Sequence, residues 1–112
     1  IKVAVLNNSY LGMVRQWQEM FYEERYSEVY LSPELPDFVK WAEAMGCVGI
    51  RVESPEEVEP AIALANSIND RSVVIEFRVD AGEKVFPMVP AGYGNDDVLL
   101  HPNQNDRREF LR

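Results

Sequence analysis

The sequence predicts an α/β fold, namely a partial doubly wound parallel sheet of about three strands with flanking helices. Apolar segments of strand length lie at residues 1–6, 47–52 and 72–79, and apolar residues between them recur at helical spacing. Strands joined by helical crossovers pair in parallel with right-handed connections. A parallel strand is usually buried on both faces, so we expect further strands beside the first one and interpret the chain as part of a longer protein.

Three helical segments are expected between and beside these strands. Their apolar periodicity covers residues 12–24, 35–45 and 54–70, and Gly46 suits the residue that ends the second helix. The third helix begins with Ser-Pro-Glu-Glu, which is typical of a capping box with proline in the first turn. Pro60 lacks the N–H that a helix interior requires, and we therefore expect a local irregularity near that turn.

Composition excludes several classes of partner. The 112 residues carry 11 basic and 19 acidic side chains, a net charge of −8, so no basic footprint for nucleic acid is present. No apolar run approaches the ~20 residues needed to span a bilayer, and we expect no membrane partner. Cys47 is the single cysteine. We interpret it as a small buried hydrophobe. Because a single cysteine cannot form an internal disulfide, the sequence favours a reducing compartment.

The clearest functional signal is the pair Asn7-Asn8 at the end of the first predicted strand. Ligands bind at the carboxyl ends of strands in open parallel sheets, and amide oxygens suit a phosphate-bound Mg²⁺. Gly12, at the start of the next helix, would allow close backbone approach to an anion. The alternative is that both asparagines cap turns and that Gly12 is an ordinary turn glycine.

Longer motifs extend this signal. Residues 7–17 read N-N-x-x-x-G-M-V-x-x-W, residues 36–40 read P-D-F-V-K, and residues 86–92 read F-P-M-V-P-A-G. This pattern resembles the second half of the thiamine-diphosphate motif of the acetohydroxyacid synthase (acetolactate synthase) catalytic large subunit. The resemblance runs in collinear order over about residues 1–98.

The resemblance implies a role for individual residues. The Asn8 side chain and the Tyr10 backbone carbonyl are expected to bind Mg²⁺, and Asn7 to support the loop. The residues expected to contact thiamine diphosphate are Asn8, Ser9, Tyr10, Leu11, Gly12 and Met13.

A substrate pocket is implied at Met13, Trp17 and Ala91. Met13 and Trp17 share one helical face, so the alternative is that both belong to the core. Arg15 and Gln16 are expected on another face, in solvent or at an interface.

The resemblance also divides the chain into residues 1–94, the C-terminal half of a thiamine-diphosphate-binding domain, and residues 95–112, a tail that includes His101. An acidic Mg²⁺ ligand and the glutamate that activates the cofactor are expected outside this chain. We therefore expect no catalytic residue here, and an isolated fragment that is inactive and binds the cofactor weakly or not at all.

The implied activity is the decarboxylation of pyruvate and its carboligation to a second 2-ketoacid, pyruvate or 2-ketobutyrate, in branched-chain amino acid biosynthesis. FAD would bind in a domain outside this chain. A homodimer or homotetramer, a small regulatory subunit, and a location in the bacterial cytoplasm or a eukaryotic organelle are further expectations. Two alternatives remain: another thiamine-diphosphate-dependent decarboxylase or carboligase, and a non-catalytic α/β interaction module.

Overall fold

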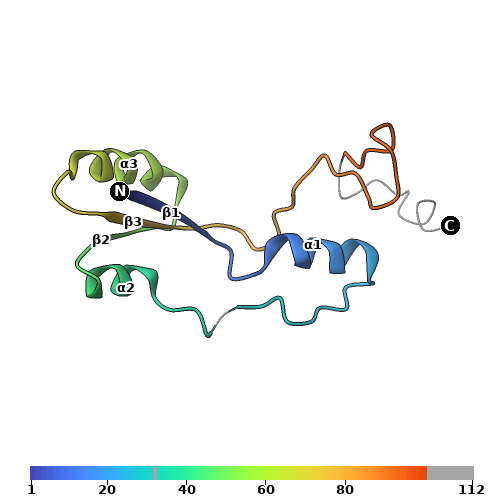
Figure 1. Cartoon of the computed structure of the whole chain (residues 1–112), viewed down its shortest axis with the longest axis horizontal. Coiled ribbons are helices and arrows are strands. Elements are labelled where there is room, and N and C mark those ends of the chain that lie inside the picture. The colour runs from blue at the N-terminus through green and yellow to red at the C-terminus, as the bar shows by residue number, and fades with distance from the viewer. Residues whose placement is uncertain (32, 101–112) are drawn as a thin grey trace. The chain divides into compact units, whose positions relative to one another are not determined.

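The computed structural model describes residues 1–31 and 33–100, which fall into two compact units. The first unit comprises Ile1–Tyr10 and Tyr30–Ala81, and the second comprises Leu11–Val29 and Gly82–Arg112. Figure 1 shows the course of the chain through both. The expectations for His101 and the rest of the tail beyond residue 100 lie outside the described residues.

The first unit is built on a parallel sheet of three strands. The strands are β1 (Lys2–Asn7), β2 (Val48–Val52) and β3 (Val73–Arg78), in the order β1-β3-β2. Ile75 at the centre of β3 is in register with Ala4 of β1 and Ile50 of β2. The predicted fold class and the parallel pairing are therefore confirmed. Because all three strands run in one direction, their carboxyl ends meet at one edge of the sheet.

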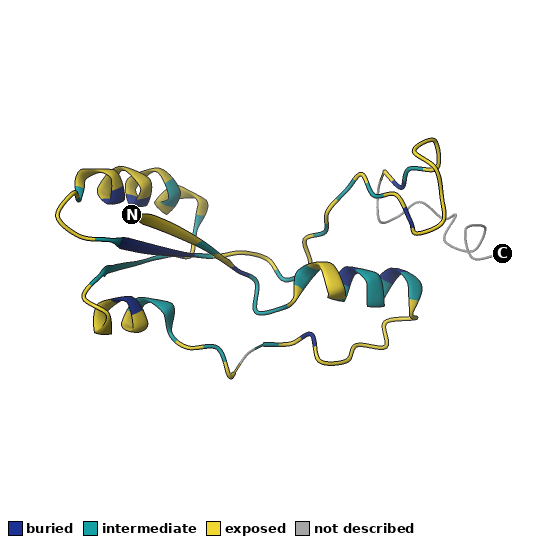
Figure 2. Ribbon diagram, viewed as in Figure 1, coloured by how far each residue is buried: buried dark blue, intermediate teal, exposed yellow. Residues whose placement is uncertain are grey.

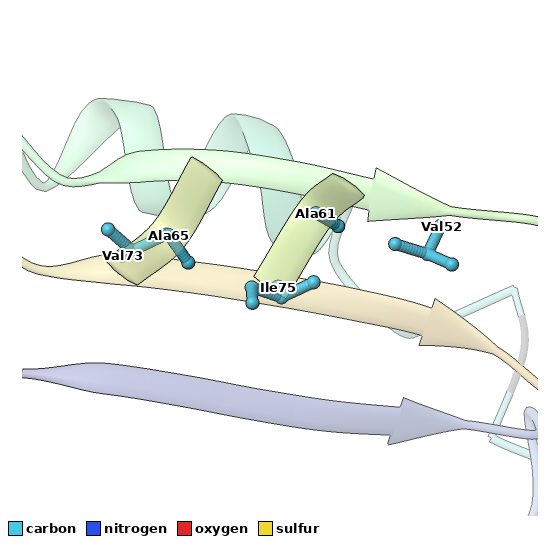
Figure 3. Close-up of a cluster of buried hydrophobic side chains, with 5 residues drawn as sticks. All are labelled: Val52, Ala61, Ala65, Val73 and Ile75. Atoms are coloured by element: carbon cyan, nitrogen blue, oxygen red, sulfur yellow. The ribbon is translucent and has the colours of Figure 1, made fainter. Parts of the chain in front are cut away.

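Helix α3 (Val58–Ser67) packs on one face of this sheet and forms the hydrophobic core with it (Figure 3). Ala61 and Ala65, one turn apart on α3, face Val73 and Ile75 of β3, and the alanines allow close approach of the helix backbone. The buried members of the cluster are Val52, Ala61, Ala65, Val73 and Ile75. In Figure 2 the central strand β3 is buried over most of its length, whereas β1 is largely exposed.

The start of α3 is irregular, as Pro60 predicts. A 3₁₀ turn, η1 (Pro55–Glu57), precedes the α-helix, and the Glu57 carboxylate accepts hydrogen bonds from the N–H groups of Glu53 and Ser54 at 2.7 and 3.2 Å. Since α3 begins at Val58, Pro60 falls in its first turn, where a missing N–H breaks no helical hydrogen bond.

Helix α2 (Phe38–Ala44) covers the opposite face of the sheet and is shorter than predicted. It begins after Asp37, whose carboxylate accepts hydrogen bonds from Val39 N and Lys40 N, both at 3.1 Å. This side-chain cap fixes the helix start three residues beyond the predicted one. Gly46, at a φ of 76°, ends the helix as predicted.

Cys47 is partly exposed rather than buried, because it lies in the turn between α2 and β2 and outside both elements. The prediction that Cys47 is a small buried hydrophobe is therefore wrong.

The second unit contains α1 (Gly12–Phe21) and a described C-terminal segment, residues 82–100, without helices or strands. Helix α1 ends three residues before the predicted Glu24, because Glu23 and Glu24 have φ values of 55° and 59° and so leave the right-handed helical region. Within residues 82–100, Met88 and Leu99 form an antiparallel bridge with N···O distances of 2.9 and 2.8 Å. The irregular backbone expected for residues 86–94 is confirmed.

Among the described residues, no helix is both long and apolar enough to cross a membrane.

Gly49 sets how closely α2 approaches the sheet. A Cβ at this position of β2 would lie 2.7 Å from the backbone oxygen of Val39 in α2, so Gly49→Ala forces the helix or strand backbone to move. We expect it to lower the free energy of unfolding by about 1–3 kcal/mol, measured by urea denaturation. In the control Gly94→Ala, the nearest atom lies 3.7 Å away, and the change should stay within about 0.5 kcal/mol. Equal losses in both variants would contradict this account.

Candidate cofactor-binding loop and its polar support

The loop that follows β1 is held in shape by its own asparagine side chains. Asn7 Oδ1 accepts a hydrogen bond from Ser9 N, and Asn8 Oδ1 accepts one from Tyr10 N, each at 3.0 Å. Ser9 between them has a φ of 63°, in the left-handed region that few serines adopt. Such conformations persist where the surrounding structure over-determines them, and they gather at functional sites.

The same loop is fastened to the segment at residues 30–31. Leu31 N donates to Ser9 O at 2.9 Å, and Tyr10 forms an antiparallel bridge with Tyr30, with ring centroids 5.1 Å apart. Backbone and aromatic contacts therefore hold the loop at the carboxyl end of β1, the edge at which parallel sheets bind ligands.

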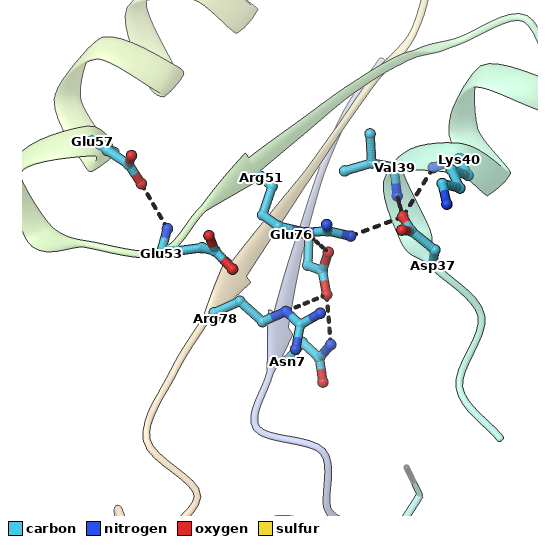
Figure 4. Close-up of polar contacts among 9 residues, drawn as sticks. All are labelled: Asn7, Asp37, Val39, Lys40, Arg51, Glu53, Glu57, Glu76 and Arg78. Atoms are coloured by element: carbon cyan, nitrogen blue, oxygen red, sulfur yellow. Dashed lines mark hydrogen bonds and ion pairs between the residues drawn. The ribbon is translucent and has the colours of Figure 1, made fainter. Parts of the chain in front are cut away.

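Beneath the loop lies a buried carboxylate, Glu76 of β3, whose side chain is 1% exposed. Its oxygens accept hydrogen bonds from Asn7 Nδ2 at 2.6 Å and Arg51 Nε at 2.8 Å, and Arg78 Nε lies at 2.9 Å (Figure 4). Arg51 also donates to Asp37, the N-cap of α2, at 2.8 Å. The two carboxylates and two guanidinium groups balance in charge. The network therefore ties the ends of all three strands to α2.

The electrostatics of this network keep both acids ionised. Burial raises the pKa of Glu76, but the hydrogen bonds from Asn7 and Arg51 and the charges of Arg78 and Arg51 outweigh it, so the pKa lies below the ordinary glutamate value. The backbone hydrogen bond from Lys40, together with Arg51, lowers the pKa of Asp37. The hydrogen bond to Glu76 raises the pKa of Arg51.

Sequence reasoning missed Glu76. The available signal was a single acidic residue inside the apolar strand V-V-I-E-F-R, because a charge among core residues requires partners. The position of those partners in β1 and β2 depends on the register, which the sequence does not give directly.

The oxygen donors of the loop fit a divalent cation in part. Asn8 is half-buried, and its amide oxygen has two lone pairs, of which the hydrogen bond from Tyr10 N uses one. Turn capping, the alternative interpretation, therefore holds for both asparagines and leaves Asn8 able to bind a metal ion. Residues 1–31 and 33–100 contain no group of three or more His, Cys, Asp or Glu side chains that could hold one. The Asn8 amide oxygen and the Tyr10 backbone carbonyl oxygen are both neutral.

The remaining predicted site residues lie in the second unit. Leu11 is the N-cap of α1 and offers no side-chain acceptor, so the first N–H groups of the helix are suited to an anion. Met13 is 48% exposed, and Trp17 is half-buried with its ring 5.1 Å from that of Phe21. Ala91 is exposed in an irregular segment. The assignment of Met13, Trp17 and Ala91 to a substrate pocket stays a prediction.

The prediction for Gln16 is wrong. The sequence predicts this side chain in solvent or at an interface, but it is buried, with 2% of its surface exposed. Its Oε1 accepts from Val85 N at 2.8 Å and its Nε2 donates to Val85 O at 3.0 Å, so the side chain pairs with the backbone as a strand would. Its Nε2 also lies 3.4 Å from Met88 Sδ, and Lys84 forms an ion pair with Glu19 one turn along α1. These contacts fix residues 84–88 against the helix.

Comparison with known proteins first identifies the class of this fold and loop. Residues 1–77 match the family model described as "Thiamine pyrophosphate enzyme, C-terminal TPP binding domain". The chain therefore belongs to this family of thiamine pyrophosphate enzyme domains.

Individual relatives narrow the class to acetolactate synthases. The chain is 58% identical to acetolactate synthase of Mycobacterium avium over 101 residues. This aligned region is 88% of the present chain and 16% of that protein. It is 46% identical over 102 residues to the acetolactate synthase isozyme 3 large subunit of Escherichia coli (89% and 18% covered). It is 39% identical over 109 residues to the mitochondrial acetolactate synthase catalytic subunit of Saccharomyces cerevisiae (97% and 15% covered). The predicted resemblance to this large subunit is confirmed, and the chain spans less than a fifth of the length of these relatives.

Gln16→Ala should loosen the segment at residues 82–89. Without the amide, Val85 loses two hydrogen bonds to a buried side chain, each worth about 0.5–1.5 kcal/mol, and the local opening free energy falls accordingly. Hydrogen exchange read out by mass spectrometry should show faster exchange in peptides covering that segment. Gln18→Ala is the matched control, because Gln18 makes the same two-point contact with Ser27 at an exposed site, where water replaces it. Unchanged exchange at residues 82–89 in Gln16→Ala would refute this role.

Proposed function

We propose that this chain forms part of an acetolactate synthase catalytic large subunit. In that subunit it would help to decarboxylate pyruvate and ligate the product to a second 2-ketoacid. The observation that carries this proposal is the self-capped Asn7–Tyr10 loop at the carboxyl end of β1, in a chain 58% identical to an acetolactate synthase. We assign residues 1–94 to the C-terminal half of its thiamine-diphosphate-binding domain and residues 95–112 to a tail.

The loop residues are assigned to the Mg²⁺–diphosphate group of the cofactor. Asn8 Oδ1 and the Tyr10 carbonyl would be two hard oxygen ligands of Mg²⁺, and residues 8–13 would line the cofactor. The N-terminus of α1 would favour its negative charge. When bound, thiamine diphosphate supplies the electron sink for loss of CO₂ and for formation of the new carbon–carbon bond.

The loop carries no charge, and Asn8 and Tyr10 would offer Mg²⁺ only neutral oxygens. The resemblance implies that an acidic Mg²⁺ ligand and the activating glutamate lie elsewhere in the protein. The chain by itself would then be inactive, because it positions the cofactor without supplying the groups that activate it.

The assembly follows from the same assignment. The E. coli relative is named a large subunit and the yeast relative a mitochondrial catalytic subunit, which supports a small regulatory partner and, in a eukaryote, an organellar location. A homodimer or homotetramer and, in a bacterium, a cytoplasmic location are part of the same proposal. FAD would bind outside this chain, and pyruvate and 2-ketobutyrate would be its substrates.

Product analysis tests the function directly. The full-length protein, supplied with pyruvate, thiamine diphosphate, Mg²⁺ and FAD, should release acetolactate, and omission of Mg²⁺ or thiamine diphosphate should abolish the product. Acetaldehyde as the main product would instead indicate a simple decarboxylase. A protein that yields neither product and binds no thiamine diphosphate in calorimetry would indicate a non-catalytic module.

Trp17→Leu should alter the choice of acceptor. Leucine keeps the helix propensity of α1 but removes the flat ring proposed to contact the extra methylene of 2-ketobutyrate. That contact is worth ~1–3 kcal/mol. Competition between 2-ketobutyrate and pyruvate in the full-length protein should therefore shift toward acetolactate.

Trp41→Leu in α2, where Trp41 is 52% exposed, is the matched control and should leave the ratio unchanged. An unchanged product ratio in Trp17→Leu, together with a Tm lowered by many degrees, would place Trp17 in the core and contradict the pocket assignment.

A further inference from the structure

Glu76 carries a buried charge, and the proposed function assigns no role to it. It occupies the central strand, is 1% exposed, and lies on the face of β3 opposite the α3 core. A buried carboxylate is costly unless it is fully paired. Replacement by a hydrophobic residue of similar size is often neutral for stability in such networks, so stability alone does not account for a charge at this position.

Glu76 makes two sets of contacts. Through Arg51 it is connected to Asp37 at the start of α2, which stabilises the packing of that helix on the sheet. Asn7 connects it to the loop: Glu76 Oε1 accepts from Asn7 Nδ2 at 2.6 Å, and Asn7 Oδ1 accepts from Ser9 N at 3.0 Å. Figure 4 shows Glu76 between these two branches.

The carboxylate fixes which way the Asn7 amide faces. An amide has donors on one end and an acceptor on the other. With the amide reversed, Asn7 Oδ1 would face the Glu76 carboxylate and Nδ2 would face Ser9 N–H, two repulsive contacts in place of two hydrogen bonds. Asn7 is only 9% exposed, so water cannot readily take over either partner. The acceptor that holds Ser9 in its left-handed conformation therefore depends on Glu76.

We infer that Glu76 is a positioning residue for the metal-binding loop. It orients the Asn7 amide, which holds Ser9, and thereby places the neighbouring Asn8 amide oxygen and Tyr10 carbonyl for Mg²⁺. This inference rests on the proposed function, because it concerns the Mg²⁺–diphosphate site assigned to that loop. Outer-shell partners of metal ligands commonly change metal affinity about 10–100-fold when mutated, which sets the expected scale.

The test uses the full-length protein saturated with thiamine diphosphate. Mg²⁺ affinity is measured by calorimetric titration, and kcat is measured at saturating Mg²⁺. Glu76→Leu removes the acceptor at similar volume and should weaken Mg²⁺ binding about tenfold, while kcat at saturation changes less than about twofold because the interaction serves ground state and transition state equally. Asp37→Asn is the matched control: it removes one charge from the same network, leaves Asn7 and Glu76 in contact, and should not alter Mg²⁺ affinity.

A double-mutant cycle shows whether Glu76 acts through Asn7. Asn7→Ala should weaken Mg²⁺ binding to a similar extent, and addition of Glu76→Leu to it should cause no further loss, because coupled residues are non-additive. Full additivity would overturn the inference. If Glu76→Leu does not fold, Glu76→Gln retains a single acceptor oxygen for Asn7, Arg51 and Arg78. It should give a smaller loss in the same direction, also absent in the Asn7→Ala background.

Asn8→Ala separates failure of the inference from failure of the proposed function. If Asn8→Ala weakens Mg²⁺ binding but the folded Glu76 variants match the parent within about twofold, the metal site stands and the positioning role is wrong. If Asn8→Ala also leaves Mg²⁺ affinity unchanged, the metal assignment itself is wrong, and the inference falls with it.

Discussion

A single buried carboxylate determines how the strand ends of this sheet are arranged. Glu76 lies in the middle strand, where Asn7 of β1 and Arg51 of β2 donate hydrogen bonds to it from the two neighbouring strands and Arg78 of β3 pairs with it from its own strand. Because an unpaired buried charge costs several kcal/mol, a shift in register of either outer strand would be strongly disfavoured. The apolar core on the other face opposes a slip of one residue, which would turn its side chains to the wrong face, but a slip of two residues keeps them on the same face.

The same interaction links the scaffold to the proposed chemistry. Asn7 is both the last residue of β1 and the acceptor for Ser9 N, so the sheet and the loop share one amide group. A loop with a strained serine is thereby held by a rigid element, as a site for a small cation requires. Within residues 1–31 and 33–100, Asn8 makes no hydrogen bond to the Glu76 network, and its amide oxygen keeps a lone pair for a ligand.

Much of the scaffold could be predicted from the sequence because its signals are local. The strand at residues 73–78, Gly46 at the end of α2 and the irregular start of α3 each follow from residue type and spacing. The local misses concern helix ends and Cys47, whereas the failure at Gln16 depends on tertiary contacts. Gln16 looks like a solvent residue in a helical pattern, but its side chain is buried and pairs with the backbone of Val85, 69 residues away. Glu76 was missed for the same reason. The loop itself was found through Asn7-Asn8, whose position after an apolar strand is a local signal.

The two-point contact of Gln16 with Val85 couples the formation of α1 to the attachment of the C-terminal segment. Gln16 and Glu19 lie three residues apart, so both face residues 84–85 only when α1 is already helical. Conversely, a ten-residue helix is marginal in water without tertiary contacts. Helix formation and attachment of the C-terminal segment are therefore thermodynamically coupled. The motif around Trp17 and the motif around Met88, distant in sequence, become ordered in one cooperative step.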